Sequence, residues 1–137
     1  MFFKTDKNKD NNNDLTKVAA LLIHAAKIDE NYSKQEEEII KDTLLKIGAS
    51  NQNVNKLIKK ALEIETNSNQ ILEFTKEVKN MENFNKIKII ETLWRIIYSN
   101  KEADIYETNL MRRLAGLLYI DNKIMGDIKD KIKNENS

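Results

Sequence analysis

Cysteine and proline are absent from this chain of 137 residues, and histidine and glycine are scarce. Without cysteine there is no disulfide framework, no thiolate zinc site, no iron–sulfur cluster and no cysteine nucleophile. The single histidine, His24, excludes any site that needs two imidazoles from one chain. The three glycines, Gly48, Gly116 and Gly126, lie too far apart to form a phosphate-binding loop, which excludes P-loop and Rossmann nucleotide sites.

The net charge is also small, and the apolar runs are short. The 23 basic and 22 acidic side chains give a net charge of +1, too little to attract nucleic acid at long range. The longest apolar run, Val18 to Ile23, is far shorter than the roughly 20 residues that span a bilayer. The first residues lack the apolar centre of a signal peptide. We therefore expect a cytoplasmic protein with no membrane span and no nucleic-acid partner.

Apolar side chains recur at helical spacing from Asp14 onward, and no segment alternates as a half-buried strand does. Capping and turn residues cluster at breaks near 29–33, 48–51, 66–69, 80–83, 100–104 and 119–122. We predict an all-α fold, a bundle of about seven helices, over residues 14–133. The charged and amide-rich residues 1–13 are expected to form a mobile polar tail, and residues 134–137 a frayed C-terminus.

Two stretches of the chain match in residue character when the second is shifted by 71 positions. Ala25 to Asp29 then lies on Ile96 to Asn100, and Glu36 lies on Glu107. Each copy has the pattern helix–loop–helix–turn–helix. The pattern predicts two similar halves in a pseudo-two-fold arrangement, with the two polar loops in equivalent places.

Each polar loop begins with an oxygen ligand and closes seven residues later with a glutamate in the first turn of the next helix. Hard cations such as Ca²⁺ or Mg²⁺ prefer a cage of such oxygens, so the loops are a candidate site for a divalent cation. The candidate ligands are Asp29, Glu30 and Glu36 in the first loop, and Asn100, Asp104 and Glu107 in the second. Neither loop has the spacing of an EF-hand.

A capping interpretation explains the same glutamates without a ligand. Ser33-Lys34-Gln35-Glu36 has the spacing of a capping box, in which Ser33 accepts from the amide three residues on and Glu36 reaches back. Asp104 to Glu107 is a close variant. Both glutamates are therefore structural in this alternative.

His24 lies one turn before the first loop, in a largely apolar helix. Its imidazole either reaches the ligand cluster, acts as a pH-sensitive switch, or is a hydrogen-bonded residue at the edge of the core, which is the commoner role. Glu91 and Glu107 are the acidic residues near Arg95 in the sequence, and one of them is expected to pair with Arg95 or Arg112.

Several of these segments together resemble the TerB-like family, which includes tellurite-resistance protein B and the N-terminal domain of the DjlA co-chaperone. The resemblance covers about Asp14 to Lys133. The residues that carry it are Leu22 to Asp29, Ser33, Glu36, Glu91 to Tyr98, Glu107 and Leu110 to Ala115. The most specific part runs from Leu93 to Ala115. It implies a small cytoplasmic helical module of two similar halves. It also implies a link to stress responses and an acidic cluster that binds a divalent metal.

The chain departs from the loop pattern of the family it resembles, which is Asp-Gly with a glutamate seven positions after the aspartate. Glu30 and Lys101 stand in place of the loop glycines, and Asn100 stands in place of the second aspartate. Asn100 keeps a carbonyl oxygen but loses the charge, and Lys101 adds a competing cation. We therefore expect a weaker affinity for metal than in a member with both aspartates.

Three functions are compatible with these patterns. The leading hypothesis is a non-enzymatic TerB-like module whose loops form an acidic patch for Ca²⁺ or Mg²⁺ or for a partner protein. The second is a protein-interaction scaffold or co-chaperone-like module with no metal site, in which an exposed apolar groove binds another helix. The third, a hydrolase that uses His24 with Asp29, lacks an identifiable nucleophile and a substrate-anchoring loop. We expect a monomer or weak homodimer with a protein partner.

Overall fold

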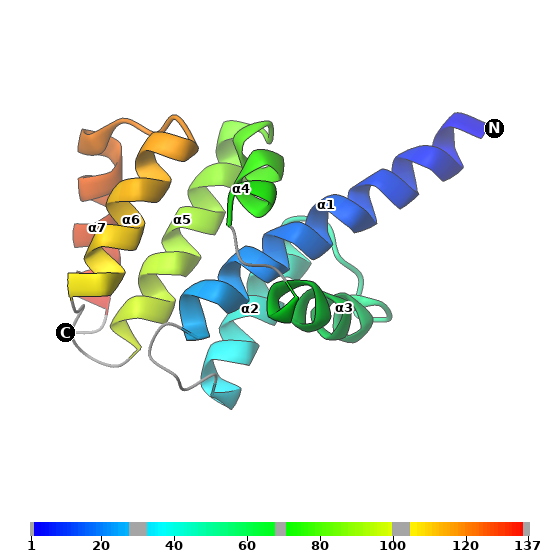
Figure 1. Cartoon of the computed structure of the whole chain (residues 1–137), viewed down its shortest axis with the longest axis horizontal. Helices are drawn as coiled ribbons and strands as arrows, with labels where there is room; N and C mark the ends of the chain where they lie inside the picture. The colour runs from blue at the N-terminus through cyan, green and yellow to red at the C-terminus, as the bar shows by residue number, and fades with distance from the viewer. Residues whose placement is uncertain (1, 28–32, 68–70, 100–104, 136–137) are drawn as a thin grey trace.

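The computed structural model describes the backbone of residues 2–27, 33–67, 71–99 and 105–135, with side chains described from Leu15 onward in the first range and from Thr108 onward in the last. The helices in these ranges are α1 (Phe2–Lys27), α2 (Lys34–Lys46), α3 (Val54–Thr66), α4 (Leu72–Lys79), α5 (Asn83–Tyr98), α6 (Ile105–Leu117) and α7 (Asn122–Glu135). No strand occurs in the described ranges, so the predicted all-α fold of seven helices is confirmed (Figure 1). None of the described helices is long and apolar enough to cross a membrane.

The helices α1 and α5 form the centre of the bundle. Every residue from Val18 to Ile23 of α1 is buried, and so is every residue from Ile89 to Trp94 of α5. A helix that is largely apolar on all sides is stable only when neighbours cover all of those sides. Accordingly, α1 packs against α2, α3, α4 and α5, and α5 also packs against α2 and α7. The other helices thus surround a central pair.

The helix boundaries support the internal repeat. Under the shift of 71 positions, Lys34–Lys46 of α2 falls on Ile105–Leu117 of α6, and both ends coincide. The C-terminal ends of α1 and α5, at Lys27 and Tyr98, coincide under the same shift. The repetition predicted from residue character therefore extends to the lengths of the helices.

The turns that follow α2 and α6 share a hydrogen bond and a residue with positive φ. Gly48 and Tyr119 occupy the same place in the repeat, and both have positive φ, at 131° and 57°. The next amide donates to a carbonyl of the last helical turn at 2.9 Å in both cases, from Ala49 after α2 and from Ile120 after α6. Such a bond ends a helix in a Schellman motif, where glycine is usual. Tyr119 adopts the left-handed conformation at a cost of about 1 to 2 kcal/mol.

The N-terminal segment differs from the expected tail. Residues 2–13 continue α1 as a helix that projects beyond the bundle (Figure 1). The segment contains no proline or glycine that would end a helix, and extending an existing helix costs much less than nucleating one. The helical backbone corrects the expected start of the first helix at Asp14, while the mobility of the segment stays a prediction.

The C-terminal boundary also lies further along the chain than predicted. We expected fraying from residue 134, but α7 continues through Asn134 and Glu135. The carboxylate of Glu135 accepts two hydrogen bonds from Arg95 of α5, at 3.0 Å each, and these bonds hold the last turn of α7 against the bundle. Residues 136 and 137 lie outside the described residues.

Candidate functional site

Most of the candidate cation ligands lie outside the described residues. Asp29 and Glu30 fall within 28–32, and Asn100 and Asp104 fall within 100–104. Glu107 lies on the described backbone of α6, but its side chain is not among those described. The first loop lies between the end of α1 and the start of α2, and the second lies between the end of α5 and the start of α6.

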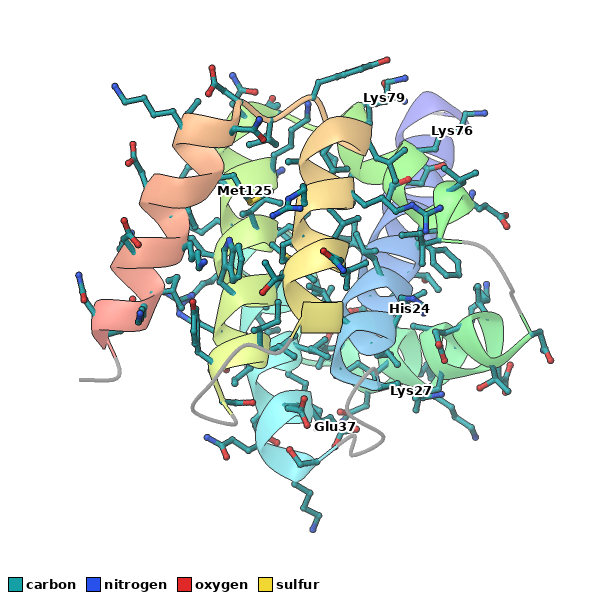
Figure 2. All side chains as sticks on the ribbon, turned by 60° about the vertical axis from the view of Figure 1, so that its left-hand side comes forward. His24, Lys27, Glu37, Lys76, Lys79 and Met125 are labelled. Atoms are coloured by element: carbon teal, nitrogen blue, oxygen red, sulfur yellow. The ribbon has the colours of Figure 1, made fainter. Side chains whose placement is uncertain are left out.

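These helix ends lie together at one end of the bundle, which we call the loop end. It comprises the C-terminal ends of α1 and α5 and the N-terminal ends of α2 and α6, which all point toward the lower side of Figure 1 and Figure 2. The helix α2 contacts both α1 and α5. The carbonyl groups at the ends of α1 and α5 carry partial negative charge and the amides at the starts of α2 and α6 carry partial positive charge, so the helix dipoles alone favour neither sign of ligand at this end.

Glu36 is a candidate ligand whose side chain is described, and it closes the predicted capping box at the start of α2. The residue is 3% exposed. Its Oε1 accepts from the backbone amide and the hydroxyl of Ser33, at 3.0 Å each, while its own amide donates to Ser33 Oγ at 3.1 Å. The capping interpretation of Glu36 is therefore confirmed. The cap uses Oε1, and a carboxylate has a second oxygen with lone pairs of its own.

His24 lies half-buried near the loop end of α1, with Lys27 close by (Figure 2). Its Nδ1 is 3.3 Å from Oε1 of Glu65 on α3. Lys27 Nζ donates to Oε2 of the same carboxylate at 2.7 Å. This placement agrees with a hydrogen-bonded residue at the edge of the core. Glu65 was not identified from the sequence, because only the packing of α3 on α1 brings it to this position.

The second half contains a related ion pair. Arg95 occupies the place of His24 in the repeat, and the last turn of α7 supplies Glu135 much as the end of α3 supplies Glu65. The hydrogen bonds between the two side chains raise the pKa of Arg95 and lower the pKa of Glu135, and burial opposes both shifts. Each half thus joins its first and third helices through a basic side chain and a glutamate.

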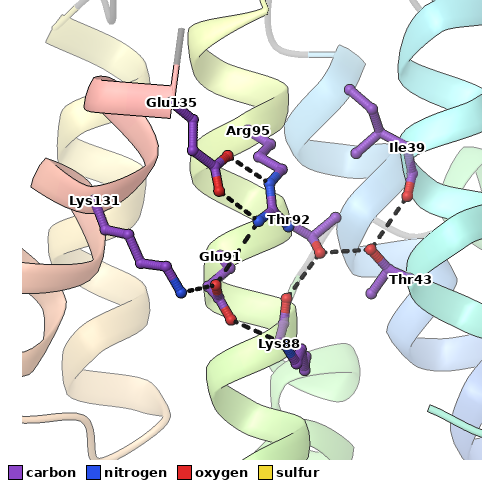
Figure 3. A network of polar contacts seen from close by, with 8 residues as sticks. All are labelled: Ile39, Thr43, Lys88, Glu91, Thr92, Arg95, Lys131 and Glu135. Carbon is purple, nitrogen blue, oxygen red and sulfur yellow. Dashed lines mark hydrogen bonds and ion pairs between the residues drawn. The ribbon is translucent and has the colours of Figure 1, made fainter. Parts of the chain in front are cut away.

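Glu91 is a buried carboxylate beside this pair, as Figure 3 shows. Its side chain is 3% exposed and its Oε2 lies 2.9 Å from Lys131 Nζ. Lys88 and Arg95 complete the cluster at 3.7 and 3.8 Å. The sequence predicted that Glu91 or Glu107 pairs with Arg95 or Arg112, and the ion pair between Glu91 and Arg95 is one of these alternatives. Lys131 and Glu135 were missed because they lie on α7, and the register of α7 on α5 is set by tertiary packing.

An aromatic pair follows the same helix toward the loop end. The rings of Trp94 and Tyr98 stack with centroids 5.9 Å apart. Burial, with a smaller effect from the charge of Asp130, raises the pKa of Tyr98 above its usual value. The hydroxyl of Tyr98 is therefore neutral at physiological pH and offers no negative charge to a cation.

No group of three histidine, aspartate or glutamate side chains gathers to hold a metal ion within the described ranges. The carboxylate of Glu65 contacts His24 and Lys27, and the carboxylate of Glu91 contacts three cationic side chains. These two carboxylates act as links between helices. The cation site in the two loops stays a prediction.

The fold and the loop end define a class of protein, a helical bundle of two similar halves with two equivalent loops at one end. The family model described as tellurite resistance protein TerB matches residues 15–130, and the chain belongs to this family. The resemblance inferred from the sequence is thereby confirmed, and TerB is not a known enzyme family. No curated protein and no solved structure matches the chain.

Proposed function

We propose that the protein is a non-enzymatic TerB module that binds a divalent cation, Ca²⁺ or Mg²⁺, at its loop end. The placement of the helix ends that flank both acidic loops at the same end of the bundle carries the proposal. Two oxygen-rich loops at one end of a bundle supply the kind of ligand that hard cations prefer. Asp29, Glu36 and Glu107 would contribute charge, and Asn100 would contribute a carbonyl oxygen.

The position of Glu36 supports this proposal. A glutamate that caps through Oε1 is held in one orientation by two hydrogen bonds from Ser33. Its second oxygen is then preorganised for a ligand, because the rotamer of the side chain is already fixed. Capping and cation binding therefore use different oxygens of the same carboxylate.

Substitution of Glu36 separates the two roles. Glutamine also serves in a capping box, so Glu36→Gln should keep the melting temperature while the affinity for Ca²⁺ falls at least tenfold, as calorimetry would measure. Glu36→Ala should lose the affinity and also about 1 kcal/mol of stability. Asp42 is exposed on the same helix, and Asp42→Asn is the matched control that should change neither quantity.

The cation proposal fails if millimolar Ca²⁺ or Mg²⁺ produces no heat and shifts no amide resonance near the loop end. It also fails if Glu36→Gln and Asp42→Asn bind the cation equally well.

A protein-binding scaffold without a metal site is the second candidate, favoured by the confirmed capping box of Glu36. Under this alternative, Glu36→Ala lowers only the stability, and a partner still binds. The description of the family supports a link to a tellurite-type stress response under either candidate. Growth on tellurite of cells that lack the protein tests this link.

A further inference from the structure

A groove between α4 and α6 lies at the far end of α6 from the loop end, and we call it the α4–α6 groove. Its volume is about 310 Å³. It is lined by Leu72, Thr75, Lys76 and Lys79 of α4, by Gly116 and Leu117 of α6, and by Tyr119 of the following turn. The four α4 residues have the spacing of one helix face.

This groove exposes apolar side chains that the core does not use. Leu72 is 46% exposed and Tyr119 is 74% exposed. The helix α4 already contributes Phe74 and Val78 to the core from its other face, and both are almost fully buried. Leu72 and Tyr119 therefore present apolar surface to the outside of the bundle.

The backbone at Tyr119 is an independent indication of function. Its counterpart in the first half is Gly48, and both residues have positive φ in equivalent turns. Tyrosine is disfavoured in this conformation, and its exposed ring adds little to the core. A strained residue that displays an aromatic ring beside a groove is typical of a binding surface.

The groove is also cationic. Lys76 and Lys79 lie on its α4 side and extend outward at the same end of the bundle (Figure 2), and its lining includes no carboxylate. Lys79 Nζ lies 4.6 Å from the centroid of the Tyr119 ring. Arg113 lies one turn before Leu117 on α6 and is exposed. None of these three cations makes an ion pair with another described residue.

We propose that the α4–α6 groove binds an acidic amphipathic helix of a partner protein. The apolar face of such a helix would cover Leu72 and Tyr119, and its carboxylates would pair with Lys76 and Lys79, as in other helix-in-groove complexes. Two lysines neutralise too few phosphates to hold a nucleic acid. The inference gives the scaffold candidate a surface and does not depend on the cation proposal.

The test uses a labelled peptide of about 14 residues with leucines at helical spacing i, i+3, i+4 and i+7 and glutamates elsewhere. Fluorescence anisotropy with the full chain, in EDTA, should show saturable binding. A scrambled peptide of the same composition and a version with lysines in place of the glutamates should each bind at least tenfold more weakly. EDTA keeps the result separate from any cation site.

Two variants of the groove test its residues. The double variant Lys76→Glu/Lys79→Glu should lose at least tenfold in affinity, while Lys59→Glu/Lys60→Glu, on the exposed face of α3, should bind as the original chain does. Tyr119→Gly should bind at least fivefold more weakly yet fold at least as well, because glycine suits the turn. Circular dichroism would confirm that each variant is folded.

Several results would overturn the proposal. The proposal is wrong if the peptide does not bind at millimolar concentration, or if the Lys76→Glu/Lys79→Glu chain binds the peptide with the affinity of the original chain. It is also wrong if the peptide leaves the amide resonances of Leu72, Leu117 and Tyr119 unchanged while it shifts others. Competition by duplex DNA would identify a nucleic-acid surface instead. Self-association that the same charge reversals abolish would identify a second copy of this chain as the occupant.

Discussion

Gly48 and Tyr119 are two very different residues at equivalent positions of the repeat, and both have positive φ. Both lie just past the end of a helix, where a positive φ lets the following amide bond back to the helix. At Gly48 a side chain has room, since an added Cβ would meet only Leu15 Cδ1, at 3.9 Å. The requirement at this position is therefore conformational and not steric.

Substitution of Gly48 by alanine should destabilise the fold by about 1 to 3 kcal/mol, because alanine is strained at this φ. Gly126→Ala is the matched control: an added Cβ meets nothing within 4 Å inside α7, so the substitution should stabilise by about 0.5 to 1 kcal/mol. Urea denaturation of the two variants measures both values. A loss at Gly126 as large as that at Gly48 would contradict the conformational explanation.

Individual residues also show which parts of the candidate site could be predicted from the sequence. The capping role of Glu36 was predictable from the sequence because a capping box is a local pattern of four residues. The partners Glu65 and Glu135 lie far from His24 and Arg95 in the chain, and no local spacing links them. Only the packing of α3 on α1 and of α7 on α5 identifies these pairs.

At the scale of elements, a pair of buried hydroxyls joins α2 to α5. Thr43 Oγ1 and Thr92 Oγ1 are 2.5 Å apart, and each also contacts a backbone carbonyl of its own helix, that of Ile39 or of Lys88 (Figure 3). The two hydroxyl groups have two hydrogens to donate, but they make three contacts between oxygens. The two hydroxyls therefore depend on each other, and changes at the two positions should not be additive.

Replacement of either threonine by valine, which has nearly the same shape, should cost about 1 kcal/mol. The double variant Thr43→Val/Thr92→Val should cost clearly less than the sum, because the contact between the two hydroxyls is lost in each single variant and is lost only once in the double variant. Urea denaturation of the four chains gives the coupling energy. Thr75 is buried and its hydroxyl donates to Leu72 O of its own helix at 3.0 Å, so Thr43→Val/Thr75→Val should be additive. Additivity in both cycles would disprove the link between α2 and α5.

Helix boundaries were predicted well wherever a capping residue stands at a break, as at Ser33 before α2. The start of α1 was not predicted, because residues 4–13 are charged or polar and no residue there signals the start of a helix, so composition alone suggested a tail. Helix propagation from the buried half of α1 decides the backbone there.

At the scale of the whole molecule, the projecting part of α1 should be dispensable. A chain that begins at Asp14 should unfold within about 0.5 kcal/mol of the full chain, because Leu15 is the first buried side chain among those described. Further truncation through Val18 removes two core side chains and should cost at least 2 kcal/mol. Denaturant midpoints and helical circular dichroism distinguish the cases. A large loss from the first truncation would show that residues 2–13 contact the bundle.

The central position of α1 and α5 affects the cooperativity of unfolding. Buried side chains of the described helices belong to a single hydrophobic cluster that crosses the boundary between the repeats. A half released from the other would expose one face of its central helix to water, at a free-energy cost proportional to the apolar area. Although the two halves repeat one pattern of helices, we expect that neither half folds as a separate domain. The molecule should melt as one cooperative unit, and its two loops should be lost together.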